Sequence, residues 1–348
     1  MSIRAWLCSQ PDTFCPNVTF GTNSATEARH DLPRLDIDLC LDRRIETMAN
    51  YPSLQADIDN WYASASYFDW QGSRICYQHK GAGPVLLMVH GFPTAGCDWC
   101  DMAKGLAEHF TIIAPDIADA GQSANPTRQT YTLHEHADML EALLKHLDFG
   151  SAHLLGHDVG DAICQELIAR QNEQSLGFLI QSCVFLNGGI LMKAHRPRFL
   201  QSRLAGRYGE WIARFLPAQP FMKTISNIFG ERKPGPEALR TLWSVSTGIN
   251  GRASLARRSQ NMHDRRQHAG RWVRALQETD IPLCMINGVM DPISGAHACE
   301  AIEREIPAIE LIRLEGVGHF PLIEAPQQCV EHLLSFHRRL GLKITVEQ

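Results

Sequence analysis

Alternation between apolar runs and helix-patterned segments, from Ser66 to about Leu340, constrains the fold of this chain more than any other feature. PVLLMVH is a continuous apolar run of the buried-strand type. Five further runs predict strands, and they are TIIAPDI, SAHLLGHD, FLIQSCVFLN, IPLCMING and AIELIRLEG. Helical patterns follow them, among them HEHADMLEALLKHL, DAICQELIARQ and CVEHLLSFHRRL. Such alternation is typical of a mostly parallel sheet covered by helices on both faces. We therefore predict an α/β fold.

The alternation begins after an amino-terminal segment of different character. Residues 1–65 carry turn formers and acidic residues, with a short helix expected only near Asp42 to Ala49, so this extension should pack on another part of the protein. Directly after it, SYFDW and RICYQHK flank Gln71-Gly72 and predict a β-hairpin.

A second departure from the pattern runs from 190 to 275. This stretch is rich in helical sequence, is interrupted by five prolines, and is too long for a simple connection. We expect an inserted helical lid over the ends of the strands. The predicted organisation is therefore an extension (1–65), a core (66–189 and 276–348) and a lid (190–275).

Charge is distributed unevenly between these parts. The lid holds 17 Lys and Arg residues against four acids, whereas residues 1–70 hold ten acids and five Arg residues. The acidic extension could pack against the basic lid, or the lid could attract an anionic lipid surface or an acidic substrate. The formal net charge of -5 argues against a nucleic-acid partner.

Composition also predicts the compartment. The chain has 11 cysteines, an odd number without paired framework spacing, which favours reduced thiols. Neither a signal peptide nor an apolar run long enough to span a membrane is visible, so we expect a cytoplasmic protein in which the Asn17 glycosylation sequon is a chance match. No metal-ligand spacing or dinucleotide fingerprint occurs, and we expect no cofactor and no metal.

The residues that predict chemistry begin with the segment Gly156 to Gly160, at the junction of an apolar run and a helix. Its glycines permit the sharp strand-to-helix turn called a nucleophile elbow, and the central residue is Asp158 instead of the commoner Ser. A carboxylate is ionised near neutral pH and attacks without a base. Attack on an ester would give an unproductive anhydride, whereas attack on saturated carbon leaves an alkyl ester. The expected substrates are therefore small, largely apolar carbon electrophiles.

Hydrolysis of that ester requires a base and a group that orients it. His319 follows the run AIELIRLE and Asp291 follows IPLCMIN, so both lie at the carboxyl ends of predicted strands. Carboxyl ends of parallel strands meet at one edge of a sheet. Taken singly, an Asp-Pro is usually a turn and a lone His is usually packed or solvated. The joint order of Asp158, Asp291 and His319 predicts catalytic roles for all three.

A loop after the run PVLLMV supplies the expected oxyanion hole. The backbone N–H groups of Phe92 and Val159 are the predicted donors, and the Phe92 side chain should line the pocket. His90 is a pocket candidate, although a structural role is expected because no second base is needed. Asp116 is expected to be structural.

With these residues together, the chain resembles the α/β-hydrolase superfamily and, within it, the branch of epoxide hydrolases and haloalkane dehalogenases, whose elbow also carries Asp. The resemblance covers about 66–340 and implies the α/β-hydrolase fold. Further similarity to the mesoderm-specific transcript proteins and their bacterial relatives lies in the segments 157–161, 165–167, 186–190, 195–197 and 271–273.

The sequence departs from both branches near the leaving group. Haloalkane dehalogenases usually carry Trp directly after the nucleophile, and fluoroacetate dehalogenases carry Arg there, whereas this chain has Val159. Many haloalkane dehalogenases carry Asn in the oxyanion loop, where this chain has Phe92. Epoxide hydrolases share the His-Gly-X-Pro loop but use two lid tyrosines, and this lid has only Tyr208. Further pocket candidates are Trp211 and Trp243 for a halide, His263 as a second donor, and Asn187, at a strand end where some relatives carry their acid, as a support for the site.

Three functions remain open from the sequence. The first is epoxide hydrolysis through an ester on Asp158, and the second is dehalogenation by the same nucleophile. The third is a catalytically idle protein that binds a ligand or partner through its lid and extension.

Overall fold

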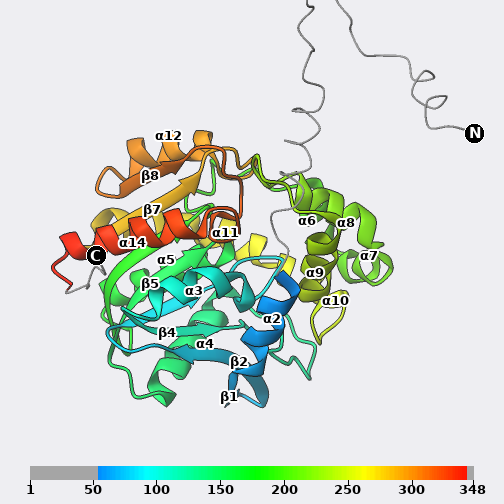
Figure 1. Ribbon diagram of the computed structural model, residues 1–348, viewed down its shortest axis with the longest axis horizontal. Coiled ribbons are helices and arrows are strands. Elements are labelled where there is room, and N and C mark those ends of the chain that lie inside the picture. The colour runs from blue at the N-terminus through cyan, green and yellow to red at the C-terminus, as the bar shows by residue number, and fades with distance from the viewer. Residues whose placement is uncertain (1–53, 343–348) are drawn as a thin grey trace, which may run out of the picture. The chain divides into compact units, whose positions relative to one another are not determined.

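The structure is a computed structural model that describes residues 54–342. The helix expected near Asp42 to Ala49 lies outside these residues. Figure 1 shows a central sheet between two layers of helices, with the lid helices beside it.

A single eight-stranded sheet has the order β1-β2-β4-β3-β5-β6-β7-β8. β1 and β2 are antiparallel, β2 and β4 are antiparallel, and every other neighbouring pair is parallel. The strands are β1 (Ser66–Trp70), β2 (Ser73–Lys80), β3 (Val85–Val89), β4 (Thr111–Pro115), β5 (Ser151–His157), β6 (Leu179–Leu186), β7 (Leu283–Gly288) and β8 (Glu310–Leu314). The predicted α/β fold with a mostly parallel sheet is confirmed, and a strand forms at each of the six predicted runs. β8, at the edge of the sheet, has only Leu314 buried.

The hairpin formed by β1 and β2 is also confirmed. Trp70 pairs with Ser73, which leaves Gln71 and Gly72 as a two-residue loop. Both loop residues have positive φ, 51° and 77°, as the tight turn that joins two right-twisted strands requires. The Gln-Gly sequence serves this turn because glycine adopts positive φ without strain.

Helices cover both faces of the sheet, and this explains why the parallel strands β3, β4 and β7 are buried along their whole length. One face packs on α4 (Leu133–His146), α5 (Val159–Asn172), the carboxyl-terminal half of α11 (Asn261–Glu278) and α12 (Ala296–Glu305). The other packs on η2 (Gly96–Trp99), α3 (Cys100–Leu106), α13 (Pro321–Glu324) and α14 (Pro326–Arg339). All five residues of β3 are buried as a result.

Between β6 and β7 the sheet receives no strand, and the chain forms short helices instead. They are α6 (Phe199–Leu204), α7 (Gly209–Phe215), α8 (Ala218–Ser226), α9 (Pro236–Thr247) and α10 (Ala253–Ser259). Pro217 and Pro236 stand at helix starts, where the missing N–H costs nothing. This is the helical stretch predicted at 190–275, although α11 continues through residue 275 into the core. The division of the chain into extension, core and lid stays a prediction.

One element of the extension was not predicted. Residues Leu54–Ala63 form helix α2, which buries Ile58 and Trp61. Asp57 pairs with Lys104 of α3 at 3.0 Å, and Thr241 of α9 donates to Gln55 at 3.1 Å. The expectation that residues 1–65 hold no helix beyond the one near Asp42 is therefore wrong, because a short apolar stripe becomes stable once it packs on other helices.

Two expectations from composition concern the described residues. Eight cysteines lie among them, and all eight are buried free thiols, in agreement with the predicted reduced state. Among residues 54–342, no helix combines the length and hydropathy that a membrane span needs.

Two neighbouring arginines of α10 fasten the lid to the core. Arg257 donates to both carboxylate oxygens of Asp119 at 2.8 Å, and both side chains are almost fully buried. Arg258 donates to the carbonyl oxygens of Pro93 and Thr94 at 2.8 and 3.0 Å. These contacts fix α10 against the loops that follow β3 and β4.

Replacing Arg257 with Met leaves the Asp119 carboxylate buried without its partner. We expect the free energy of unfolding to fall by about 3–5 kcal/mol, as for other broken buried ion pairs. Urea denaturation monitored by circular dichroism measures the change. Arg304→Met is the control, because Arg304 is largely exposed in its pair with Glu305; equal losses in the two variants would contradict the role given to Arg257.

Candidate active site

The tight junction between β5 and α5 carries Asp158. β5 ends at His157, α5 begins at Val159, and Asp158 between them has φ 49° and ψ −104°, a strained conformation for a residue with a side chain. A Cβ at Gly160 would lie 2.0 Å from the carbonyl oxygen of Val89, so only glycine allows α5 to start this close to β3. The predicted elbow is present, and it raises the Asp158 side chain at the end of the sheet.

Asp158 lies where the order of strands reverses. β3 stands between β4 and β5, and the helices that follow β3 and β5 cover opposite faces, which opens a crevice at the carboxyl ends of the strands. Phe92 follows β3 and its backbone N–H donates to Asp158 Oδ2 at 3.1 Å. Val159 is the first residue of α5, where backbone N–H groups have no acceptor inside the helix. The Phe92 N–H therefore contacts the Asp158 carboxylate, and Val159 directly follows Asp158 along the chain.

Asp291 and His319 form a hydrogen-bonded pair at the same edge. The distance from His319 Nδ1 to Asp291 Oδ2 is 2.8 Å, and both side chains are buried. Asn187 Nδ2 and Ser294 Oγ donate to the same carboxylate oxygen at 3.1 and 2.8 Å. The other oxygen accepts the backbone N–H of Ile293 at 2.8 Å. These contacts fix the orientation of Asp291. Asn187, named from the sequence as a pocket candidate, does not line the pocket and instead donates to Asp291.

Backbone contacts hold the loop that carries His319. Glu324 accepts the N–H groups of Gly230, Gly318 and Phe320 at 2.7–3.0 Å. His157 Nε2 lies 2.9 Å from the carbonyl oxygen of His319. Burial lowers the pKa of His157 to about 4, so this imidazole is neutral and donates from Nε2.

The charges of these groups depend on each other. Burial alone would lower the pKa of His319, but the Asp291 carboxylate, its hydrogen bond and the Asp158 carboxylate together raise that pKa to about 9. Burial would raise the pKa of Asp291, yet His319 and the donated hydrogen bonds lower it to about 2. At neutral pH, His319 is therefore an imidazolium between two carboxylates.

Arg265 of α11 is a contact of Asp158 that the sequence did not predict. Its Nη1 lies 3.8 Å from Asp158 Oδ1, its Nη2 donates to the Gly189 carbonyl at 2.9 Å, and its side chain is 2% exposed. Burial would raise the pKa of Asp158, but His319 and Arg265 outweigh it and lower that pKa. A signal was available, because Arg265 lies on the same buried stripe of α11 as Met262.

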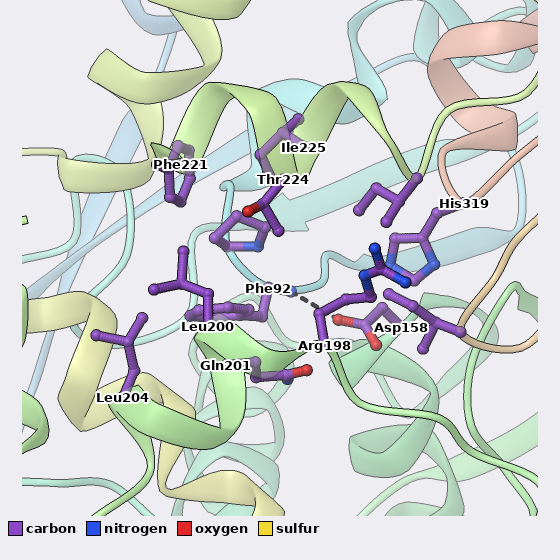
Figure 2. A pocket seen from close by; sticks show the side chains of 13 residues that line it. Phe92, Asp158, Arg198, Leu200, Gln201, Leu204, Phe221, Thr224, Ile225 and His319 are labelled. Atoms are coloured by element: carbon purple, nitrogen blue, oxygen red, sulfur yellow. Dashed lines mark hydrogen bonds between the residues drawn. The ribbon is translucent and has the colours of Figure 1, made fainter. Parts of the chain in front are cut away.

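A largely apolar pocket opens above Asp158 and His319 (Figure 2). Its apolar lining consists of Phe92, Pro93, Leu200, Leu204, Phe221, Ile225, Ile228 and Ile293. Three polar lid residues also line it, Arg198, Gln201 and Thr224, and none of them was predicted. Arg198 directly precedes α6, where no periodic pattern marks a residue as buried.

The lid residues proposed from the sequence lie elsewhere. Tyr208 and Trp211 are 69% and 67% exposed, and with His263 they line a separate surface depression. Trp243 is not among the pocket-lining residues and packs edge-on against Phe221, with ring centroids 4.9 Å apart. The prediction that Tyr208, Trp211, Trp243 and His263 line the substrate pocket is wrong. Sequence order inside the lid does not reveal which side of each helix packs against the core.

His90 and Asp116 have structural contacts. His90 is fully buried, its Nε2 accepts the N–H of Ile117 at 3.0 Å, and it does not line the pocket. Burial lowers its pKa to about 3, so it stays neutral. Asp116 accepts the N–H groups of Gly96 and Gln122 at 2.7 and 2.8 Å. The prediction that His90 belongs to the substrate pocket is wrong, whereas the structural role expected for both residues agrees with these contacts.

Solved structures with the same fold include both branches named above. Haloalkane dehalogenase DbeA of Bradyrhizobium elkani superposes with a TM-score of 0.65 at 20% identity, over 79% of this chain and 99% of that chain. The epoxide hydrolase CorEH superposes with a TM-score of 0.65 at 19% identity, over the same shares of the two chains. At such identities the likeness shows the fold.

Sequence relatives define the family. The profile described as "alpha/beta hydrolase fold" matches residues 84–222. The mesoderm-specific transcript protein of Mus musculus is 30% identical over 298 residues, which cover 82% of this chain and 89% of the relative. The homologue of Homo sapiens matches equally well. The chain therefore belongs to the α/β-hydrolase family, together with the mesoderm-specific transcript proteins.

Proposed function

We propose that this protein is a hydrolase that attacks an electrophilic carbon with Asp158 and releases the product from an alkyl ester, with epoxides as its substrates. The observation that carries this proposal is the position of Asp158. It occupies the elbow, lines the pocket, and accepts the Phe92 N–H beside the pair formed by His319 and Asp291.

The first step is nucleophilic attack. The pKa of Asp158 is lowered, chiefly by His319 and Arg265 against the effect of burial, so the carboxylate is ionised at neutral pH. Phe92 holds Oδ2, which leaves Oδ1 to form the bond to carbon. The carbon–oxygen bond of the epoxide breaks, and its electron pair stays on the departing oxygen. That oxygen then takes up a proton.

The second step requires a base, and the first step creates it. Formation of the ester removes the negative charge of Asp158, one of the charges that raise the pKa of His319. The pKa of His319 falls and the imidazolium loses its proton, which balances the proton gained by the opened oxygen. Neutral His319 then activates the water that attacks the ester carbonyl, while the Phe92 and Val159 N–H groups stabilise the oxyanion.

The lid supports an oxygen leaving group better than a halide. Gln201 and Thr224 bring N–H and O–H donors to the pocket, whereas the two tryptophans considered for a halide lie outside its lining. Dehalogenation by the same nucleophile is the second candidate, and halide release from a panel of haloalkanes separates it from epoxide opening. A catalytically idle binding protein would turn over neither class.

A single turnover of an epoxide in heavy-oxygen water should place the label in Asp158, because water attacks the ester carbonyl and one of its oxygens stays in the carboxylate. Digestion and mass spectrometry of the peptide that contains Asp158 measure the label. A peptide containing Asp116 serves as the internal control. Diol formation with an unlabelled Asp158 would exclude the covalent route.

The variant His319→Gln should form the ester and fail to hydrolyse it, since attack precedes water activation. We expect turnover to fall about 10²–10⁴-fold, the usual contribution of a general base. Intact-protein mass spectrometry should detect the adduct of enzyme and substrate. His263→Gln is the matched control, because His263 lies outside the pocket; loss of turnover without an adduct would argue against the proposed order of steps.

The charge coupling predicts a shift in the titration of His319. Nuclear magnetic resonance of the histidine side chains should give a pKa of about 9 in the wild type. The pKa should be lower in Asp158→Asn, which removes the charge as the ester does. Because the folded pKa lies above the ordinary value, this group stabilises the fold fully below pH 6.5 and loses that effect as the pH rises through about 9. An unchanged pKa in Asp158→Asn would contradict the coupling.

A further inference from the structure

Arg198 is the cationic lid residue among the residues that line the pocket. Figure 2 shows Arg198 at the end of the pocket where Asp158 and His319 also lie. The side chain is half-buried, and within residues 54–342 it has neither a hydrogen bond nor an ion pair with another side chain. An arginine presents five N–H donors, and those of Arg198 are not taken up by the polar side chains that share the pocket, Asp158, Gln201 and Thr224.

The carboxylates at the floor of the pocket are already paired. Asp158 Oδ2 accepts the Phe92 N–H, and Asp158 Oδ1 faces Arg265 at 3.8 Å. Asp291 is hydrogen-bonded to His319, Asn187, Ser294 and Ile293, as described above. Arg198 therefore has no role in neutralising either carboxylate.

The two carboxylates nearest the pocket have cationic partners other than Arg198. Asp158 faces Arg265 at 3.8 Å, and Asp291 is hydrogen-bonded to His319 at 2.8 Å. Arg198 forms no ion pair with any residue within 54–342, although it lines the pocket. An anionic ligand group would pair with this cation and accept its N–H groups.

The rest of the pocket limits what else the ligand can contain. Beyond Arg198, the lid side of the pocket consists mainly of Leu200, Leu204, Phe221 and Ile225. These side chains fit an alkyl or aryl group and offer no partner for a second charge. The complementary ligand is an amphiphilic anion with its charged end near Asp158.

We propose that the substrates carry a carboxylate close to the electrophilic carbon, paired with Arg198, and an apolar group in the lid. The electrophilic carbon in this proposal rests on the proposed function, whereas the carboxylate rests on Arg198 and the residues that line the pocket. A planar guanidinium binds a carboxylate through two parallel hydrogen bonds, which would also orient the adjacent carbon toward Asp158. Oxirane carboxylates with an aryl or alkyl substituent are the corresponding substrate class.

Binding tests the carboxylate independently of catalysis. Calorimetry compares 3-phenylpropanoate with its neutral amide, 3-phenylpropanamide, on the wild type, Arg198→Met and Arg198→Lys. We expect the wild type to prefer the carboxylate and Arg198→Met to bind it about 10- to 100-fold more weakly, with amide binding unchanged. Arg198→Lys should fall between them, because it keeps the charge and loses the bidentate geometry.

Arg196→Met is the matched control, since Arg196 is an exposed arginine two residues away that does not line the pocket. Thermal unfolding of each variant verifies that it is folded. If Arg198→Met does not fold, the test is the comparison of the wild type with Arg198→Lys. The proposal would be overturned if both proteins preferred the carboxylate over the amide to the same extent. Equal binding of carboxylate and amide by the wild type, or equal loss of both in Arg198→Met, would also overturn it.

Turnover then tests the link to the reaction. The substrate pair is 3-phenyloxirane-2-carboxylate and the neutral (3-phenyloxiran-2-yl)methanol, each compared between wild type and Arg198→Met so that their different intrinsic reactivities cancel. We expect kcat/KM to fall about 10- to 100-fold for the carboxylate alone. A fall of the same size for both epoxides would show that Arg198 acts on the opening oxygen instead and would overturn the proposal. Carboxylate binding that depends on Arg198, without turnover or label in Asp158, would sustain the anion site while the proposed function fails.

Discussion

The close approach of α5 to β3 is the constraint on which the site depends. Gly160 brings the start of the helix against the Val89 carbonyl, and this contact forces Asp158 into its strained backbone conformation. The strain is maintained because the surrounding strands and helices are buried and cannot relax. One local bend thus places a carboxylate beside the Phe92 N–H, at the only reversal of strand order among the described parallel strands.

Burial of several charges near that bend makes them mutually dependent. Asp158, Asp291 and His319 are each at most 4% exposed, and isolated charges at such positions would shift their pKa values and become neutral. They remain charged because each faces an opposite charge, and Arg265 adds a second cation beside Asp158. The same dependence couples the charge of Asp158 to the protonation of His319.

The lid takes part in the site through its attachment to the core. Arg257 and Arg258 fix α10 on the loops after β4 and β3, and the second of these loops carries Phe92. The packed lid helices in turn bring Arg198 and Phe221 to the pocket. The apolar wall and the cation above Asp158 therefore depend on buried pairs between lid and core that are remote from the reacting atoms.

The sequence by itself determined the sheet, the elbow and the strand-end positions of Asp158, Asp291 and His319. These features follow from local rules, because strand periodicity, glycine conformations and the convergence of parallel strand ends can be deduced along the chain. The missed helix α2 marks the limit of such rules, since a ten-residue stripe has little signal until it packs.

Only the tertiary structure decided which lid side chains reach the pocket. Tyr208 and Trp211, chosen by residue type, are largely exposed, whereas Arg198 lines the pocket with Asp158 and Arg265 lies 3.8 Å from the Asp158 carboxylate. The physical reason is that the orientation of short lid helices depends on packing against the core, and such packing leaves no regular period in the sequence. Residue chemistry can thus be deduced locally, but the partner of a charge depends on the fold.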